Sequence, residues 1–144
     1  MSKKLFLILI CLVSLNANDI NIIQSKYSVS ETTQKIKEIV ISKGFEVFTI
    51  IDHKQNAKNV NMEMAEAKVI LFGNPKAGTK LMQEDILSAL DLPLRVLIFK
   101  DSTANVKVAF RDVSALKVDF KLSNKEELEA MDKGLSAIIA KATN

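Results

Sequence analysis

Residues 67–82 read AKVILFGNPKAGTKLM, and this stretch decides how the rest of the sequence is interpreted. The nearly continuous apolar run from 67 to 72 predicts a strand that is central in a sheet or buried on both faces. The Gly-Asn-Pro segment at 73–75 predicts a turn, and Thr79 is expected to cap the helix that follows. Pro93 ends that helix. The stretch therefore predicts a strand, a glycine-containing loop and a helix in direct succession.

The same stretch nearly matches the phosphate-binding loop of nucleotide hydrolases. That loop needs Gly-x-x-x-x-Gly-Lys followed by Ser or Thr, because the lysine contacts the terminal phosphates and the hydroxyl binds magnesium. Here the order is Gly78-Thr79-Lys80, and exchanging two neighbours rotates each side chain by about 100° around the helix. Pro75 also removes one amide donor. We therefore interpret the loop as a strand-to-helix connection, whose first helical amides are also able to hold an anion.

Patterns outside this stretch predict four more strands and two more long helices. Alternating or β-branched residues place the strands at 20–27, 45–52, 94–100 and 107–111, with a hairpin turn at 101–105. Ser28 and Glu31 have the spacing of a capping box, and they open a helix that Gly44 ends in a left-handed conformation. Ser123 and Glu126 have the same spacing at the start of the last helix. Residues 54–64 are expected to form a short helix or turn, and residues 113–121 an extended edge segment.

The predicted order is strand, helix, strand, strand, inserted helix, strand, strand, helix. Hairpin connections dominate this order, so we expect a mainly antiparallel sheet. The sequence therefore predicts an α+β fold with two layers, in which the helices pack on one face of the sheet. A single α+β domain, residues 18–144, accounts for everything after the N-terminal segment.

The first 17 residues have the composition of a secretory signal peptide. Lys3 and Lys4 precede an eleven-residue apolar run at 5–15, and Ala17 offers a small residue for cleavage. The run is too short to span a bilayer, which takes roughly 20 apolar residues. We therefore expect a periplasmic or secreted protein with no stable membrane anchor after cleavage.

Charge and residue content restrict the partners. The chain has 20 basic and 17 acidic residues, and cleavage after Ala17 would remove Lys3 and Lys4 and leave a formal charge near +1. The clustered lysine and arginine that bind nucleic acid are missing, so no nucleic-acid partner is expected. Residues 18–144 contain no cysteine and one histidine, whereas a closed metal site needs three or four ligands. We expect no metal and no cofactor.

Three blocks of sequence resemble a known family. They are FGNPKAGTKLMQ at 72–83, ALDLPLRVLIF at 89–99 and GFEVFTIIDHKQNA at 44–57. Together they resemble the uncharacterised family called domain of unknown function 302, over residues 20–139. The resemblance implies a small α/β domain that is similar in topology to the TATA-binding-protein-like folds and is often a homodimer. It implies no settled biochemical activity.

Asp52 and His53 lie where the second predicted strand ends in a polar connection. An imidazole titrates near neutral pH, so His53 is suited to act as a proton shuttle, an anion partner or a metal ligand. Neighbouring residues on a strand point to opposite faces, which means that the two side chains need not touch. The alternative is that His53 bonds a backbone carbonyl and stabilises the loop.

The predicted ligand-binding site combines His53 with the glycine loop. We expect the C-terminal ends of the strands at 45–52 and 67–72 to converge, so that an imidazole, an amide, an ammonium group and helix-start amides meet. Such a group suits a small anionic or carbonyl-bearing ligand. The predicted members are His53, Gly73, Asn74, Pro75, Lys76 and Thr79. Asp91 and Arg95 are interpreted as a structural ion pair outside this site.

Three functions are compatible with these residues. The leading prediction is an exported domain that binds a small molecule or anion and forms a homodimer. The first alternative is a small enzyme in which His53 is the general acid or base and Asp52 orients it. The second alternative is a structural protein-interaction domain that uses an exposed sheet edge.

Overall fold

The structure is a computed structural model that describes residues 20–123 and 125–144. The predicted signal peptide at 1–17 lies outside the described residues. The α-helices, 3₁₀-helices (η) and strands, in chain order, are β1 (Ile20–Gln24), α1 (Val29–Ser42), β2 (Glu46–Asp52), α2 (His53–Asn59), β3 (Ala67–Gly73), α3 (Pro75–Glu84), η1 (Ile86–Leu90), β4 (Leu94–Lys100), β5 (Val106–Arg111), η2 (Val113–Ala115), α4 (Leu116–Asp119) and α5 (Lys125–Thr143).

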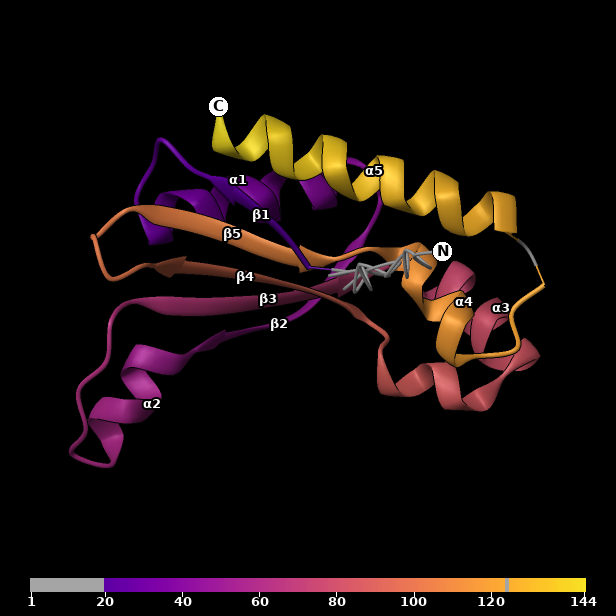
Figure 1. The fold of residues 1–144 in the computed structure, drawn as a ribbon, viewed down its shortest axis with the longest axis horizontal. Helices are drawn as coiled ribbons and strands as arrows, with labels where there is room; N and C mark the ends of the chain where they lie inside the picture. The colour runs from indigo at the N-terminus through magenta and orange to yellow at the C-terminus, as the bar shows by residue number, and fades with distance from the viewer. Residues whose placement is uncertain (1–19, 124) are drawn as a thin grey trace, which may run out of the picture.

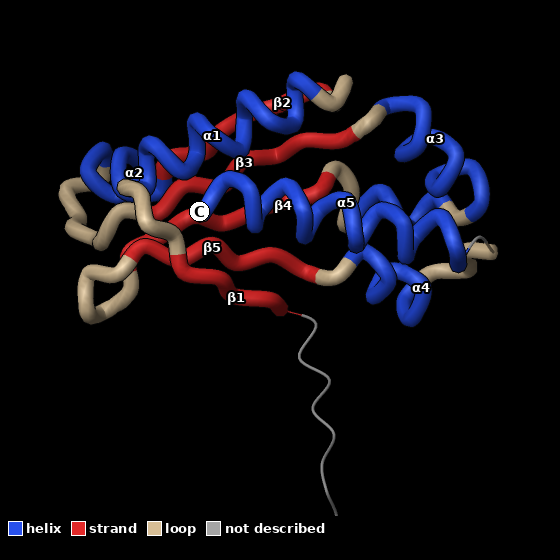
Figure 2. The backbone as a smooth tube through the Cα atoms, turned by 90° about the horizontal axis from the view of Figure 1, so that it is seen from above, coloured by secondary structure: helices blue, strands red, loops and turns tan. Residues whose placement is uncertain are grey.

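The five strands form one sheet in the order β1-β5-β4-β3-β2. Each strand runs antiparallel to its neighbours. Helices α1 and α5 lie across one face of this sheet, as the two views of the backbone agree (Figures 1 and 2). The predicted α+β fold, with a mainly antiparallel sheet and helices on one face, is confirmed.

The core lies between the sheet and the two long helices. Side chains alternate along a strand, so every second residue of the central strands faces the helices. Phe72 of β3 contacts the Phe45 ring edge-on, with ring centroids 6.1 Å apart. Burying one aliphatic side chain contributes about 1.5–3 kcal/mol. The fully buried members of this core include Val29, Ile36, Val40, Ile70, Phe72, Val96, Ile98, Val108, Leu128, Ile139 and Ala142.

The other face of the sheet is here called the open face. Among the described elements, no helix crosses the middle of β3, β4 and β5 on this side (Figure 1). The strand pairing sets its side chains in rows, and many of them are apolar. Its members include Ile20, Ile22, Thr49, Ile51, Ala67, Val69, Leu71, Arg95, Leu97, Phe99, Lys107, Ala109 and Arg111.

Local signals at the first helix and at the hairpin turn are confirmed. The Ser28 side chain accepts a hydrogen bond from the Glu31 amide, and the Glu31 carboxylate accepts one from the Ser28 amide. Gly44 follows the helix with a φ of +79°. In the turn between β4 and β5, the Asp101 carboxylate accepts hydrogen bonds from the amides of Thr103 and Asn105.

The prediction of an extended segment at 113–121 is wrong, because this segment forms η2 and α4. The Asp132 carboxylate of α5 accepts hydrogen bonds from the amides of Val113 and Ser114, which fixes the first turn. The Phe120 amide then donates to the Leu116 carbonyl at helical spacing, 2.9 Å away. A carboxylate from a distant helix therefore determines the conformation here.

Two predicted helix starts are also wrong in detail. Helix α3 begins at Pro75 rather than after Thr79, because the Asn74 side chain caps it and accepts from the Ala77 amide at 3.1 Å. Proline is favoured at the first position of a helix, where its missing amide hydrogen costs nothing. The Ser123 hydroxyl does not complete the predicted box; it donates to the Glu84 carboxylate at 2.9 Å.

Candidate functional site

The strand register separates the two halves of the predicted ligand-binding site. Asp52 pairs with Lys68, and Glu46 pairs with Gly73. His53 therefore lies beside the start of β3, whereas the glycine loop follows its end. Because β3 has seven residues and a strand rises about 3.3 Å per residue, the two halves lie about 20 Å apart. The predicted convergence is wrong, since antiparallel neighbours place their C-terminal ends at opposite edges of the sheet.

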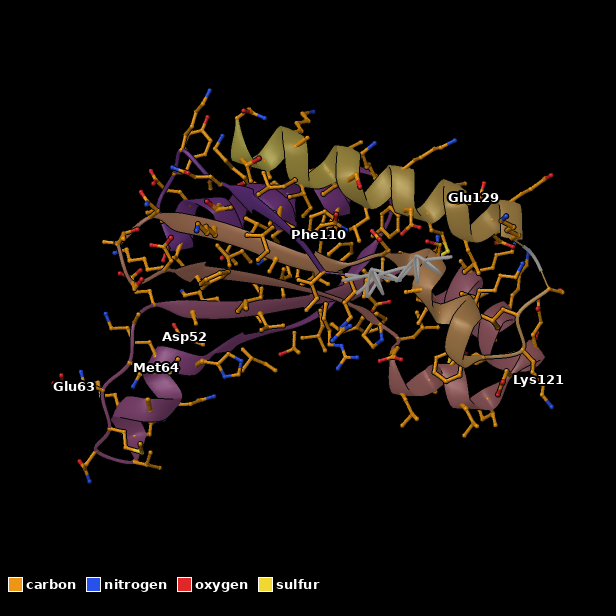
Figure 3. All side chains as sticks on the ribbon, in the orientation of Figure 1. Asp52, Glu63, Met64, Phe110, Lys121 and Glu129 are labelled. Carbon is orange, nitrogen blue, oxygen red and sulfur yellow. The ribbon has the colours of Figure 1, made fainter. Side chains whose placement is uncertain are left out.

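Asp52 caps helix α2, of which His53 is the first residue. One Asp52 oxygen accepts a hydrogen bond from the Gln55 amide at 2.9 Å, and the other lies 3.4 Å from the Lys68 ammonium. The Gln55 amide, with Lys68 as a further contributor, lowers the pKa of Asp52 below its usual value. The contacts recorded for Asp52 within the described residues thus engage the helix start and a lysine rather than the half-buried imidazole. Figure 3 shows Asp52 at the α2 end of the sheet.

The glycine-loop residues lie together at the opposite end, around the start of α3. Asn74 is occupied as the helix cap, and the side chains of Lys76 and Thr79 are exposed. Gly78 has no neighbouring atom within 4 Å of an added Cβ, so packing does not require a glycine there. This end of the sheet brings Gly73, Asn74, Pro75, Lys76 and Thr79 together without His53.

A cavity of about 680 Å³ lies at the same end of the sheet as the glycine loop, against the open face where β4 begins and β5 ends. It extends past the strand ends to η2, α4 and α5. Its apolar lining includes Ile20, Val69, Leu97, Ala109, Leu116 and Leu135, and its charged lining consists of Asp91, Arg95, Arg111 and Asp112. Sequence reasoning missed this cavity, because its residues come from seven separate strands and helices and from two connections between them.

Arg95 and Arg111 are opposite each other on neighbouring strands. Val96 pairs with Phe110 in the β4–β5 ladder, and continuing this register by one residue pairs the two arginines. Directly opposite residues have Cβ atoms about 4.5–5.5 Å apart, and like charges in such a pair are destabilising. Both side chains line the same cavity, which therefore has two guanidinium groups on one wall.

Two carboxylates accompany these arginines, and each has a recorded partner. Asp91 lies 2.8 Å from the Arg95 Nη2 atom, which confirms the predicted ion pair. The Asn21 side-chain amide donates to the Asp112 carboxylate. No group of three or more metal-ligating side chains occurs within the described residues.

Comparison with known proteins gives the family. The sequence matches the family described as "Domain of unknown function DUF302" over residues 21–142. The chain belongs to this family. Its fold is similar to the "Crystal structure of uncharacterized conserved protein DUF302 from Bacillus stearothermophilus", with a TM-score of 0.76 and 15% identity over 88% of this chain and 99% of that chain. The family resemblance seen in the three sequence blocks is thus confirmed.

Curated relatives in the genus Brucella are longer than this chain. "Fluoride-specific ion channel FluC 1" of Brucella suis biovar 1 is 33% identical over 118 residues, which cover 81% of this chain and 46% of the relative. "Fluoride-specific ion channel FluC 2" of Brucella melitensis biotype 1 has the same identity, with 81% and 44% covered. The chain therefore spans less than half the length of these relatives. In the part of the DUF302 chain that the structure describes, no helix is long and apolar enough to cross a membrane.

Proposed function

We propose that this DUF302 chain is an exported domain that binds a small molecule in the cavity beside β4 and β5. The observation that carries the proposal is a cavity of about 680 Å³ that combines apolar walls with a few converging charged groups. Sites for small ligands typically have volumes of about 300–1,000 Å³ and this kind of lining. The cavity lies at the opposite end of the sheet from His53, and its lining includes none of the predicted glycine-loop residues.

A blocking substitution tests the cavity. Ala109→Phe adds a ring to the cavity wall, and Ala67→Phe makes the same change on the open face at a residue that does not line the cavity. Both variants are screened by thermal shift against metabolites and inorganic anions, with fluoride included because of the names of the Brucella relatives. A ligand at 100 times its Kd stabilises a protein by about 2.7 kcal/mol, or several degrees in Tm. Ala109→Phe should lose that shift and Ala67→Phe should keep it; equal shifts in both would contradict the proposal.

Export is supported by the basic start, the apolar run and Ala17. The mass of the full-length gene product, purified from the envelope fraction of expressing cells, tests it. We expect a mass that lacks residues 1–17. A protein that keeps Met1 and remains in the cytosolic fraction would contradict export.

Pairing of two copies through the open face is a second role with support of its own. Ile22 is 58% exposed at the centre of β1, and Phe48 is 49% exposed beside β3. Apolar side chains gathered on one face are typical of interaction surfaces. Light scattering after gel filtration should give twice the chain mass, and Ile22→Lys should give the single mass. A monomer at every accessible concentration would contradict pairing.

A further inference from the structure

Both arginines of the chain line one cavity. The other 18 residues among its 20 lysines and arginines are all lysines. Although lysine is the usual basic residue in this chain, both positions that face each other across β4 and β5 at the cavity are arginines, Arg95 and Arg111. Arginine and lysine differ in chemistry: the planar guanidinium binds a carboxylate through two parallel hydrogen bonds and is less strongly hydrated than an ammonium group.

We propose that the ligand is a small organic carboxylate whose charged end is held by Arg95 and Arg111. This inference rests on the proposed function, because it names the ligand class of the same cavity. A bound carboxylate offsets the repulsion between two like charges on opposite residues of neighbouring strands. It also accepts hydrogen bonds from the Arg95 guanidinium, which orients the ligand.

The contacts of Arg95 leave donors available for such a ligand. Its contacts with the Asp91 carboxylate at 2.8 Å and the Leu90 carbonyl at 3.3 Å both use the Nη2 atom. A guanidinium has five N–H donors, so those on Nη1 and Nε have no recorded partner within the described residues. Arg111 already interacts with another group of the protein, and its role here is to supply a second positive charge.

The charge of the lining favours a ligand with a single negative charge. Asp91 and Asp112 also line the cavity, so the two arginines are balanced by two acidic residues. Asp91 holds Arg95 in place, and Asp112 accepts from Asn21. A polyanion such as a nucleotide would meet these carboxylates as well as the arginines. A monocarboxylate can bind the basic wall without adding much negative charge.

The remainder of the cavity suits an apolar body. Leu97 and Ala109 pair in the next row of the sheet beyond the arginines, and Val69 pairs with Leu97 in the same row. Leu116 and Leu135 line the cavity and are buried. A ligand that extends a hydrocarbon chain from its carboxylate would cover this apolar surface and remove it from water, which is favourable.

Octanoate and octan-1-ol test the inference, because they share a carbon skeleton and differ in charge. Isothermal titration calorimetry of the intact protein at low salt measures both. We expect octanoate to bind at least tenfold more tightly than octan-1-ol, as hydrogen bonds to charged groups contribute more than neutral ones. The octanoate affinity should fall with added salt.

Substitutions at the two arginines test whether they cause the preference for octanoate over octan-1-ol. Arg95→Gln and Arg111→Gln should each weaken octanoate binding about tenfold and leave octan-1-ol binding unchanged. Arg111→Lys keeps the positive charge, so it should weaken octanoate binding less than Arg111→Gln does, and it is a milder change at a position that has other protein contacts. Lys107→Gln is the control, because Lys107 lies on the same face of β5 but outside the cavity lining.

The outcomes separate this inference from the proposed function. Equal binding of the acid and the alcohol, or an acid preference that survives both Arg→Gln substitutions, would overturn the carboxylate inference and leave a small-molecule cavity in place. In that case octan-1-ol should still bind, and Ala109→Phe should abolish its binding, which would show that the cavity takes a small molecule without a preference for a carboxylate. Absence of binding by either probe, together with no hit in the ligand screen, would overturn both.

Discussion

At the scale of single residues, positions 95 and 111 matter because both are arginine and both reach one cavity. They are 16 residues apart in the chain, and only the β4–β5 hairpin makes them neighbours. The predicted turn at 101–105 already implied this pairing, since both positions are equally distant from its centre at 103. The cavity itself was not predictable in this way, because α4 and α5 complete its walls.

His53, the first residue of α2, should contribute less to the free energy of unfolding than Asp52, which caps this helix. Asp52→Ala removes the cap of α2 and the contact with Lys68, so the free energy of unfolding should fall by about 1 kcal/mol. His53→Ala should change the free energy of unfolding little, because no side-chain partner is recorded for it within the described residues. Urea denaturation measures both. If His53→Ala is the more destabilising change, the structural role assigned to Asp52 is wrong.

Asp101 should make the stability of the protein sensitive to acid. Its hydrogen bond with Lys107, followed by that with Thr103, holds the pKa of Asp101 far below its usual range. A carboxylate with a lowered folded-state pKa stabilises the protein at pH values above its unfolded pKa of about 4, and this stabilisation is lost as the pH falls below that value.

Asp101→Asn tests this dependence. The variant should be less stable than the wild type at pH 7, where the wild-type carboxylate is charged. The difference should shrink as the pH is lowered from 5 to about 2 in urea denaturation, because the Asp101 carboxylate takes up a proton in the unfolded wild type while it stays ionised in the folded protein. A difference that is constant over this pH range would show that the ionised Asp101 does not carry the effect.

At the scale of elements, signals confined to one segment predicted the structure well. The capping box of Ser28 and Glu31 and the left-handed Gly44 define α1 without help from distant residues. The segment at 113–121 failed because Asp132, on another helix, holds its first turn. Its alternating apolar residues fit an edge strand equally well in the absence of that contact.

Two glycines should respond in opposite ways to substitution by alanine. Gly134 lies within α5 and has open space around an added Cβ, so Gly134→Ala should raise the free energy of unfolding by about 1 kcal/mol. Gly44 has a φ of +79°, so Gly44→Ala should lower it by about 1–2 kcal/mol. Thermal or urea denaturation measures both changes. Effects of the same sign would contradict the conformations assigned to α5 and to the end of α1.

At the scale of the whole molecule, the direction of the strands decides where a site can form. The sequence predicted the strands and the mainly antiparallel sheet, and this antiparallel order already conflicts with a meeting of the C-terminal ends of β2 and β3. Their register places His53 and Asn74 at opposite ends. The same antiparallel order brings the start of β4 to the end of β5, where Arg95 and Arg111 meet the cavity.

Chemical-shift mapping of the amide signals during an octanoate titration tests the site most directly. We expect the largest shifts at residues along the cavity, such as Leu97, Ala109 and Arg111, and none at His53, which lies at the opposite end of the sheet. Shifts centred on α2 or on the glycine loop, or no saturable shifts at all, would contradict the assignment of the ligand site to this cavity.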